Sequence, residues 1–133
     1  MKLTRSVGYA LGILLQVHAT RDLGLVTAAR ISRGCKFPPR FLYRILRRLV
    51  DAQILTGISG PRGGYSLAMP ANKITLLDVV VAIDGQIESA DLKPVHKNHR
   101  KAIRQVNRLC DKYAKSFEGQ LKKITLAKLA ASK

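Results

Sequence analysis

The chain has 133 residues, enough for one domain with a modest hydrophobic core. Its 24 Lys and Arg residues against 8 Asp and Glu give a formal charge of +16. A surface so basic attracts polyanions, so we expect nucleic acid as the partner. No apolar run reaches the roughly 18 residues that a membrane span needs, so we expect no membrane contact.

The first predicted element is an amphipathic helix over residues 4–19. Lys2 and Arg5 stand before an apolar run that imitates a secretory signal peptide. Glycine and polar residues interrupt that run, and its larger apolar side chains fall near one helical face: Leu3, Val7, Leu11, Leu14 and Leu15. We therefore expect an internal helix and a cytoplasmic protein.

Two further helices follow a polar turn. Thr27 is a suitable N-cap for a short helix over residues 28–34, and Gly34 is suited to end it. The "KFPP" segment cannot continue a helix, whereas proline is favoured at a first helical position. A third helix is therefore predicted to begin near Pro39.

The third helix has two contrasting faces. Its apolar half holds Phe41, Leu42, Ile45, Leu46, Leu49 and Val50. Its other half holds Arg40, Tyr43, Arg44, Arg47, Arg48 and Asp51. Four arginines on one face repel each other, and a solvated face normally mixes charge signs, so we expect an anionic partner there.

A hairpin is predicted next. Residues 54–57 and 64–68 are typical of short strands, and "ISGPRG" between them has the glycine and proline of a tight turn. The turn does not need Arg62, which would stand at its tip. Thr75 then caps a helix over "LLDVVVAIDG" that Gly85 closes.

The last third of the chain is strongly basic and follows a linker at residues 86–97. A long helix is predicted from residue 98, because apolar side chains recur at steps of three and four: Ile103, Val106, Cys110, Tyr113, Phe117, Leu121 and Ile124. This near-heptad stripe favours packing against a second copy of the chain, with packing onto its own domain as the alternative. Thr125 would cap a final short helix.

This order of elements is that of a winged helix-turn-helix. We expect a mainly α fold with a small β-hairpin: a DNA-binding domain at 1–85, a linker at 86–97 and a dimerisation helix with a C-terminal segment at 98–133. The third helix would enter the major groove, where arginines contact phosphates or guanine edges, and the wing would reach the backbone or minor groove. The candidate DNA-binding residues are Lys2, Arg5, Thr27, Pro39, Arg40, Tyr43, Arg44, Arg47, Arg48, Ser59, Gly60, Arg62 and Gly63. For Arg47 and Arg48, phosphate contact and plain solvation stay open.

The sequence also resembles the Rrf2 family of bacterial transcription regulators. The segments that carry the resemblance are "MKLTRSVGYAL", "FPPRFLYRILRRLVDAQIL", "SGPRGGYSL", "ITLLDVVVAIDG" and "LKKITLAKLA". The resemblance implies a homodimer that binds a near-palindromic operator on double-stranded DNA and represses or activates genes.

Three features depart from that family. Some relatives hold an iron–sulfur cluster on three cysteines between the domain and the long helix, but "QIESADLKPVHKNHRKAIR" has no cysteine, and His96 and His99 lack cysteine companions. We therefore expect no cofactor. Tyr43 stands where many relatives have an acid. Ser59 and Arg62 alter the chemistry of the wing, so the operator sequence does not carry over.

Two other functions remain open beside a sequence-specific repressor. One is a general nucleic-acid-binding protein. The other is a thiol-based redox sensor using Cys110, otherwise a small buried side chain, or Cys35, whose neighbours Arg33 and Lys36 would lower its pKa. An enzyme is not expected, because no catalytic triad order appears and "GPRGG" lacks the ending of a phosphate-binding loop.

Overall fold

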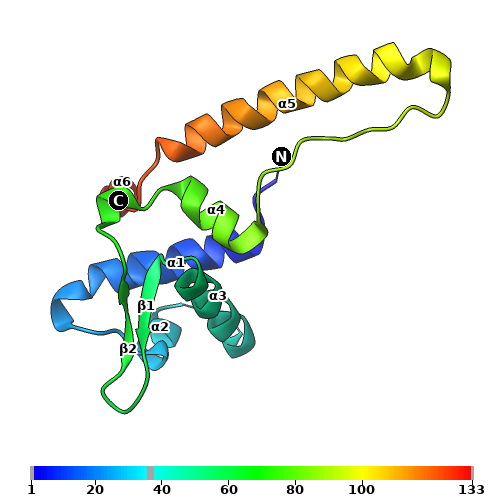
Figure 1. The fold of residues 1–133 in the computed structure, drawn as a ribbon. Coiled ribbons are helices and arrows are strands. Elements are labelled where there is room, and N and C mark those ends of the chain that lie inside the picture. Colours follow the sequence, from blue (N-terminus) through cyan, green and yellow to red (C-terminus); the bar gives the residue numbers. More distant parts are fainter. Residues whose placement is uncertain (1, 36–37, 133) are drawn as a thin grey trace.

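The computed structural model describes residues 2–35 and 38–132 (Figure 1). Met1, Lys133, and Lys36 and Phe37 of the predicted proline turn lie outside the described residues. The fold is mainly α with one antiparallel hairpin, as predicted. Its elements are α1 Arg5–Ala19, α2 Ala28–Gly34, α3 Pro39–Asp51, β1 Leu55–Ile58, β2 Gly64–Leu67, α4 Leu76–Asp84, α5 Arg100–Lys122 and α6 Leu126–Ala131. Short 3₁₀ turns occupy Arg21–Leu23, Ala71–Lys73 and Lys97–His99.

Side-chain caps begin several of these helices, as the sequence indicates. The Thr27 hydroxyl accepts a hydrogen bond from the backbone N–H of Arg30 at 3.2 Å. Thr75 and Asp78 form a reciprocal capping box at the start of α4. The Thr125 hydroxyl accepts from the N–H of Lys128 and opens α6. Each cap satisfies a backbone donor that the first turn leaves unpaired, which confirms these predicted starts.

Helix α1 is the centre of the domain, and its buried face differs from the prediction. It packs against α2, α3, α4, α6 and β2. Its fully buried residues are Val7, Ala10, Ile13, Leu14 and Val17. Leu3 precedes the helix and is 42% exposed, while Leu11 and Leu15 are half-buried. Because α1 has neighbours on several sides, its buried surface also includes Ala10, Ile13 and Val17, which the predicted single apolar face left out.

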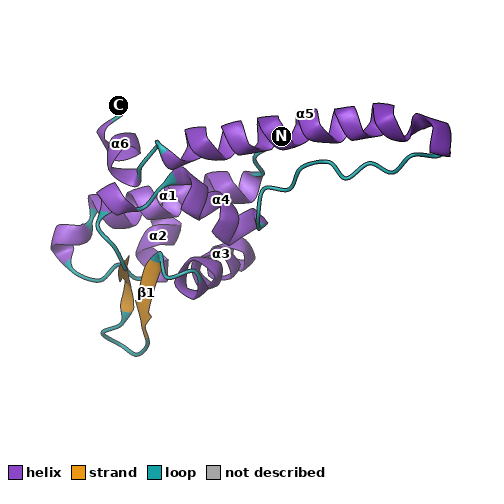
Figure 2. Ribbon diagram, turned by 45° about the horizontal axis from the view of Figure 1, so that its top comes forward, coloured by secondary structure: helices purple, strands orange, loops and turns teal. Residues whose placement is uncertain are grey.

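The hairpin is a two-stranded wing with a third segment paired to it. Leu55 lies opposite Leu67, and Ile58 opposite Gly64. Beyond the hairpin, Val26 and Tyr65 exchange two backbone hydrogen bonds of 2.9 and 2.8 Å. This bridge fixes the wing beside the start of α2 (Figure 2).

Helix α5 projects from the domain as an arm: the linker leads outward from α4, and α5 returns alongside it toward α6 (Figure 1). The Asn107 side chain donates to the carbonyl of Leu92 and accepts from its N–H, both at 3.0 Å. Ser89 donates to the carboxylate of Asp111. These side-chain bonds hold the linker along the arm.

The C-terminal residues complete the core of the N-terminal domain. The N–H of Leu76 donates to the carbonyl of Ile124, and the N–H of Leu126 donates to the carbonyl of Ile74, both at 2.8 Å. Leu121 is buried in the same hydrophobic cluster as α1, α3 and α4. Leu121, expected on the dimerisation stripe, therefore packs within its own protomer, because α5 ends against α4.

Candidate nucleic-acid interface

Helix α3 separates a buried face from a cationic one, as expected. Leu42, Ile45, Leu46 and Leu49 are in the core. The opposite face exposes Arg40, Tyr43, Arg44 and Arg47. Pro39 begins the helix, and the first turn has no acid to offset the arginines. The positive end of the helix dipole therefore adds to the positive side chains.

Phe41 was expected in the core, but its ring is 40% exposed. The Arg44 guanidinium lies over this ring, 5.9 Å from its centroid, and the ring of Tyr9 in α1 lies beside it with ring centroids 6.3 Å apart. A cation over an aromatic face is attracted to it and loses part of its motion. Phe41 therefore holds Arg44 in position on the cationic face.

Arg48 has a different role from the other arginines of α3. Its guanidinium Nη1 donates a hydrogen bond of 2.6 Å to the carbonyl of Ile83 in the last turn of α4. The last carbonyls of a helix lack partners within the helix and carry its negative partial charge. Arg48 therefore joins α3 to α4.

The tip of the wing is a five-residue turn, Ser59–Gly63. The N–H of Gly63 donates to the carbonyl of Gly60 at 2.9 Å, and Gly60 has a φ of 103°. A Cβ atom at Gly63 would lie 2.0 Å from the carbonyl oxygen of Ile58. Only glycine fits there, and the turn leaves Arg62 fully on the surface.

A groove of about 560 Å³ joins the start of α2, the exposed face of α3 and the wing. Six predicted contact residues line it: Thr27, Tyr43, Arg47, Ser59, Gly60 and Gly63. The structure thus brings together residues that lie up to 36 positions apart in sequence, from Thr27 to Gly63.

Other residues of the groove were not predicted. Ala28, Val50, Gly57, Ile58, Gly64 and Tyr65 also line it. Tyr65 could have been predicted, because it directly follows Gly63 and Gly64 at the end of the wing turn. The others carry no distinctive side-chain chemistry, so the sequence had no signal for them.

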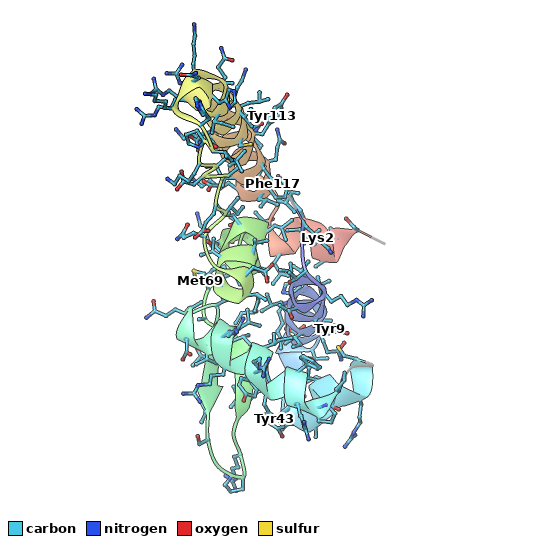
Figure 3. All side chains as sticks on the ribbon, turned by 90° about the vertical axis from the view of Figure 1, so that its right-hand side faces the viewer. Lys2, Tyr9, Tyr43, Met69, Tyr113 and Phe117 are labelled. Atoms are coloured by element: carbon cyan, nitrogen blue, oxygen red, sulfur yellow. The ribbon has the colours of Figure 1, made fainter. Side chains whose placement is uncertain are left out.

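The two N-terminal cations lie apart from this groove. Lys2 lines a small cleft with residues of α4 and α5, including Asp84 and Phe117. Figure 3 shows Lys2 near the level of α4 and α6, well separated from Tyr43. Arg5 begins α1 directly after Thr4, whose hydroxyl donates to both oxygens of Asp84 at 2.8 and 3.0 Å.

The two cysteines lie on different elements, and neither is in the groove. Cys35 follows α2, and burial raises the pKa of its thiol. This direction is opposite to the one expected from its cationic neighbours, because burial disfavours the charged thiolate. Cys110 lies half-buried on α5.

A family profile described as that of an iron-dependent transcriptional regulator, Rrf2, matches residues 3–132. The chain belongs to the Rrf2 family. Its hairpin and helices form a winged helix-turn-helix fold. It is 30% identical to the Bacillus subtilis protein YwgB, named as an HTH-type transcriptional regulator, over 65% of this chain and 55% of that one. A Neisseria meningitidis relative, NMA1593, is 23% identical over 100% of this chain and 90% of its own.

The first relatives are matched over about half of their length, 55% for YwgB and 51% for an Aquifex aeolicus regulator. Among solved structures, Rrf2-type folds match nearly throughout. The global cysteine regulator CymR of B. subtilis superposes with a TM-score of 0.77 at 20% identity, covering 100% of this chain and 98% of its own. IscR of T. potens has a TM-score of 0.70 at 22% identity, over 97% and 85%. These likenesses confirm the fold.

The iron in the family description requires a test against this chain's donors. Iron–sulfur clusters are held mainly by thiolates. The only cysteines are Cys35 and Cys110, and the segment from Gly85 to Arg100 has none. His96 and His99 have ring centroids 5.6 Å apart, but His96 Nδ1 already accepts from the N–H of Asn98. No group of three metal-ligating side chains occurs in the described part of the chain, so these residues do not fit a cluster.

Membrane contact was not expected either. Within residues 2–35 and 38–132, no helix combines the length and the apolar character that crossing a bilayer requires.

Proposed function

We propose that this Rrf2 protein is a homodimeric, sequence-specific DNA-binding repressor that works without an iron–sulfur cluster. The observation that carries the proposal is the groove in which α2, α3 and the wing meet beside a face of arginines. It supports the insertion of α3 into a major groove, with flanking elements on the backbone.

Each proposed DNA contact follows from the place of the residue on α3, in the groove or on the wing. Arg40, Tyr43 and Arg44, in the first turns of α3, read base edges or phosphates, since the first residues of a recognition helix approach the bases. Arg47 and the Thr27 hydroxyl, at the two sides of the groove, contact phosphates. Arg62 contacts the backbone or minor groove from the wing tip.

The arm supports dimer formation. Three large side chains of α5 are exposed although they are apolar or aromatic: Val106 is 43% exposed, Leu109 53% and Tyr113 63%. Ile103 and Cys110 continue the stripe and are half-buried, whereas Phe117 is half-buried against the core of its own domain. A second copy of α5 would cover these side chains, and a two-fold dimer would bind two half-sites, which explains a near-palindromic operator.

Repression follows if the operator overlaps a promoter, because a bound dimer excludes the polymerase. Catalysis has no part in this proposal. Regulation by a cluster has none either, because the donors between α4 and α5 do not fit one.

Selection of genomic fragments by the purified protein, with and without reductant, tests the proposal. We expect recovery of fragments that share one near-palindromic sequence, equally in both conditions. Recovery of unrelated sequences would instead support general nucleic-acid binding. Recovery only under reduction or only under oxidation would support a thiol switch, which the Cys35→Ser and Cys110→Ser variants would then assign.

A further inference from the structure

A second cleft, of about 740 Å³, lies between the end of α1 and the segment that follows the wing. Its volume is within the range of small-molecule sites in proteins. Most of its wall is apolar and consists of Val17, Leu25, Leu67, Met69, Pro70 and Ala71. The DNA-binding proposal makes no use of these residues.

His18, which lines this cleft, has an unpaired ring nitrogen. Its Nδ1 is buried and has no hydrogen-bond partner, alone among the non-exposed side-chain nitrogens and oxygens of the described residues. Buried polar atoms nearly always have a partner, because leaving one unpaired is costly. Burial lowers the pKa of His18 and Arg21 lowers it further, against a smaller opposite effect of Asp22. Burial therefore favours the neutral form of the ring.

Arg21 stands beside His18 on the same wall. Its Nη1 donates to the backbone carbonyl of His18 at 2.6 Å, which fixes the guanidinium at the edge of the cleft. The other N–H groups of the guanidinium make no hydrogen bond within the described residues. A planar guanidinium with unused donors matches the two oxygens of a carboxylate.

We propose that this cleft binds a small carboxylic acid with an apolar body, and that the bound acid changes the position of the wing. Its carboxylate is held by Arg21, beside His18. Its apolar body packs against Leu25, Leu67 and Met69.

The cleft reaches the DNA groove through shared residues. Tyr65 lines both cavities. It is bonded through its backbone to Val26, whose neighbours face different cavities: Leu25 lines the acid cleft and Thr27 the DNA groove. A ligand that moves Leu25 or Tyr65 therefore moves residues adjacent to the DNA contacts. This second step rests on the proposed function, whereas binding of the acid does not.

Acid binding is tested on the DNA-free protein by amide NMR spectra. The probes are 3-phenylpropionate and indole-3-butyrate, each with its amide as the uncharged match. We expect saturable shifts of the Leu25, Tyr65 and Ser66 amides with the acids, and binding at least about tenfold weaker with the amides, since a charge-assisted hydrogen bond is lost. If neither acid gives saturable shifts up to about 5 mM, or the amides bind equally well, the proposal is wrong.

Variants locate the site. Arg21→Gln should weaken acid binding about tenfold. His18 and Arg21 also line a smaller cleft beside α6, so two blocking variants distinguish the cavities: Ala68→Trp fills only the proposed one and Ser132→Trp only the other. We expect Ala68→Trp to abolish acid binding and Ser132→Trp to leave it unchanged. The reverse result, or a change of oligomeric state with Ala68→Trp, would show that another occupant fills the proposed cleft.

Anisotropy of a labelled operator duplex tests the coupling separately. We expect saturating acid to change the operator affinity of the wild type at least threefold, and to have no effect on Ala68→Trp. If the acid binds without changing the affinity, the link to the wing is overturned while the site stands. If the wild type binds no duplex at all, the proposed function fails instead.

Discussion

Arg47 and Arg48, which are neighbours on α3, have different roles. Arg47 lies in the groove with its side chain exposed, whereas Arg48 is bonded to the carbonyl of Ile83. The sequence predicts both arginines on one cationic face, because helical periodicity gives the direction in which each side chain leaves the helix. It does not show that the neighbouring helix α4 offers a carbonyl acceptor to one of them. The contact with α4 depends on tertiary packing, which no local pattern encodes.

This difference predicts opposite outcomes for two similar variants. Arg48→Ala should lower the free energy of unfolding by about 1–2 kcal/mol, because a charge-assisted hydrogen bond is lost. Arg47→Ala should leave stability within about 0.5 kcal/mol of the wild type and weaken DNA binding instead. Urea unfolding and anisotropy of a labelled duplex measure the two effects. Equal loss of stability in both variants would contradict the assignment.

Arg62 at the tip of the wing is a second single residue with a testable role. Arg62→Ala should weaken operator binding about fivefold to tenfold and reduce the salt dependence by the share of one phosphate, because a single cation leaves the interface. Arg62→Lys should keep most of the affinity if the contact is to a phosphate. Circular dichroism should show no change in either variant. Unchanged binding by Arg62→Ala would remove the wing tip from the interface.

Among the elements, the wing depends on a steric requirement at Gly63. Gly63→Ala would place a Cβ atom 2.0 Å from the carbonyl of Ile58, so the turn must open. We expect a loss of about 1–3 kcal/mol in stability and weaker DNA binding. Gly8→Ala is the matched control, since a Cβ there meets nothing within 4 Å and the helix should tolerate it. Equal behaviour of the two variants would show that the wing does not need this turn.

The exposed stripe of helix α5 is the proposed dimer interface. Leu109→Glu with Tyr113→Glu places two acids in the exposed stripe, and the dimer should dissociate because charge is not tolerated in an apolar interface. Lys115→Glu, away from the stripe, should leave the dimer intact. Light scattering measures the mass and circular dichroism the folding. A double variant that stays dimeric would contradict the proposed seam.

Element positions were largely predictable because capping and turn chemistry are local. Thr27, Thr75 and Thr125 begin their helices, and Gly85 follows the last residue of α4, as their side chains and backbone freedom require. The buried faces of α1 and the end of α5 were less predictable. Their burial depends on which elements surround them, and so Leu121 was expected in an interface between copies although it completes the core of one.

At the scale of the whole molecule, the charge of +16 attracts DNA of any sequence, and the groove is proposed to discriminate among sequences. The contribution of the charge and that of the groove differ in their dependence on salt concentration. Attraction to random duplex should fall steeply as salt rises, whereas contacts with base edges should persist.

Sequence-specific binding is tested most directly by anisotropy titration of the selected operator and of a scrambled duplex of equal length and composition, at several salt concentrations. We expect the wild type to prefer its operator by about 1,000-fold or more near physiological salt, and both affinities to fall as salt rises. Equal affinity for the two duplexes at every salt concentration would contradict sequence-specific binding.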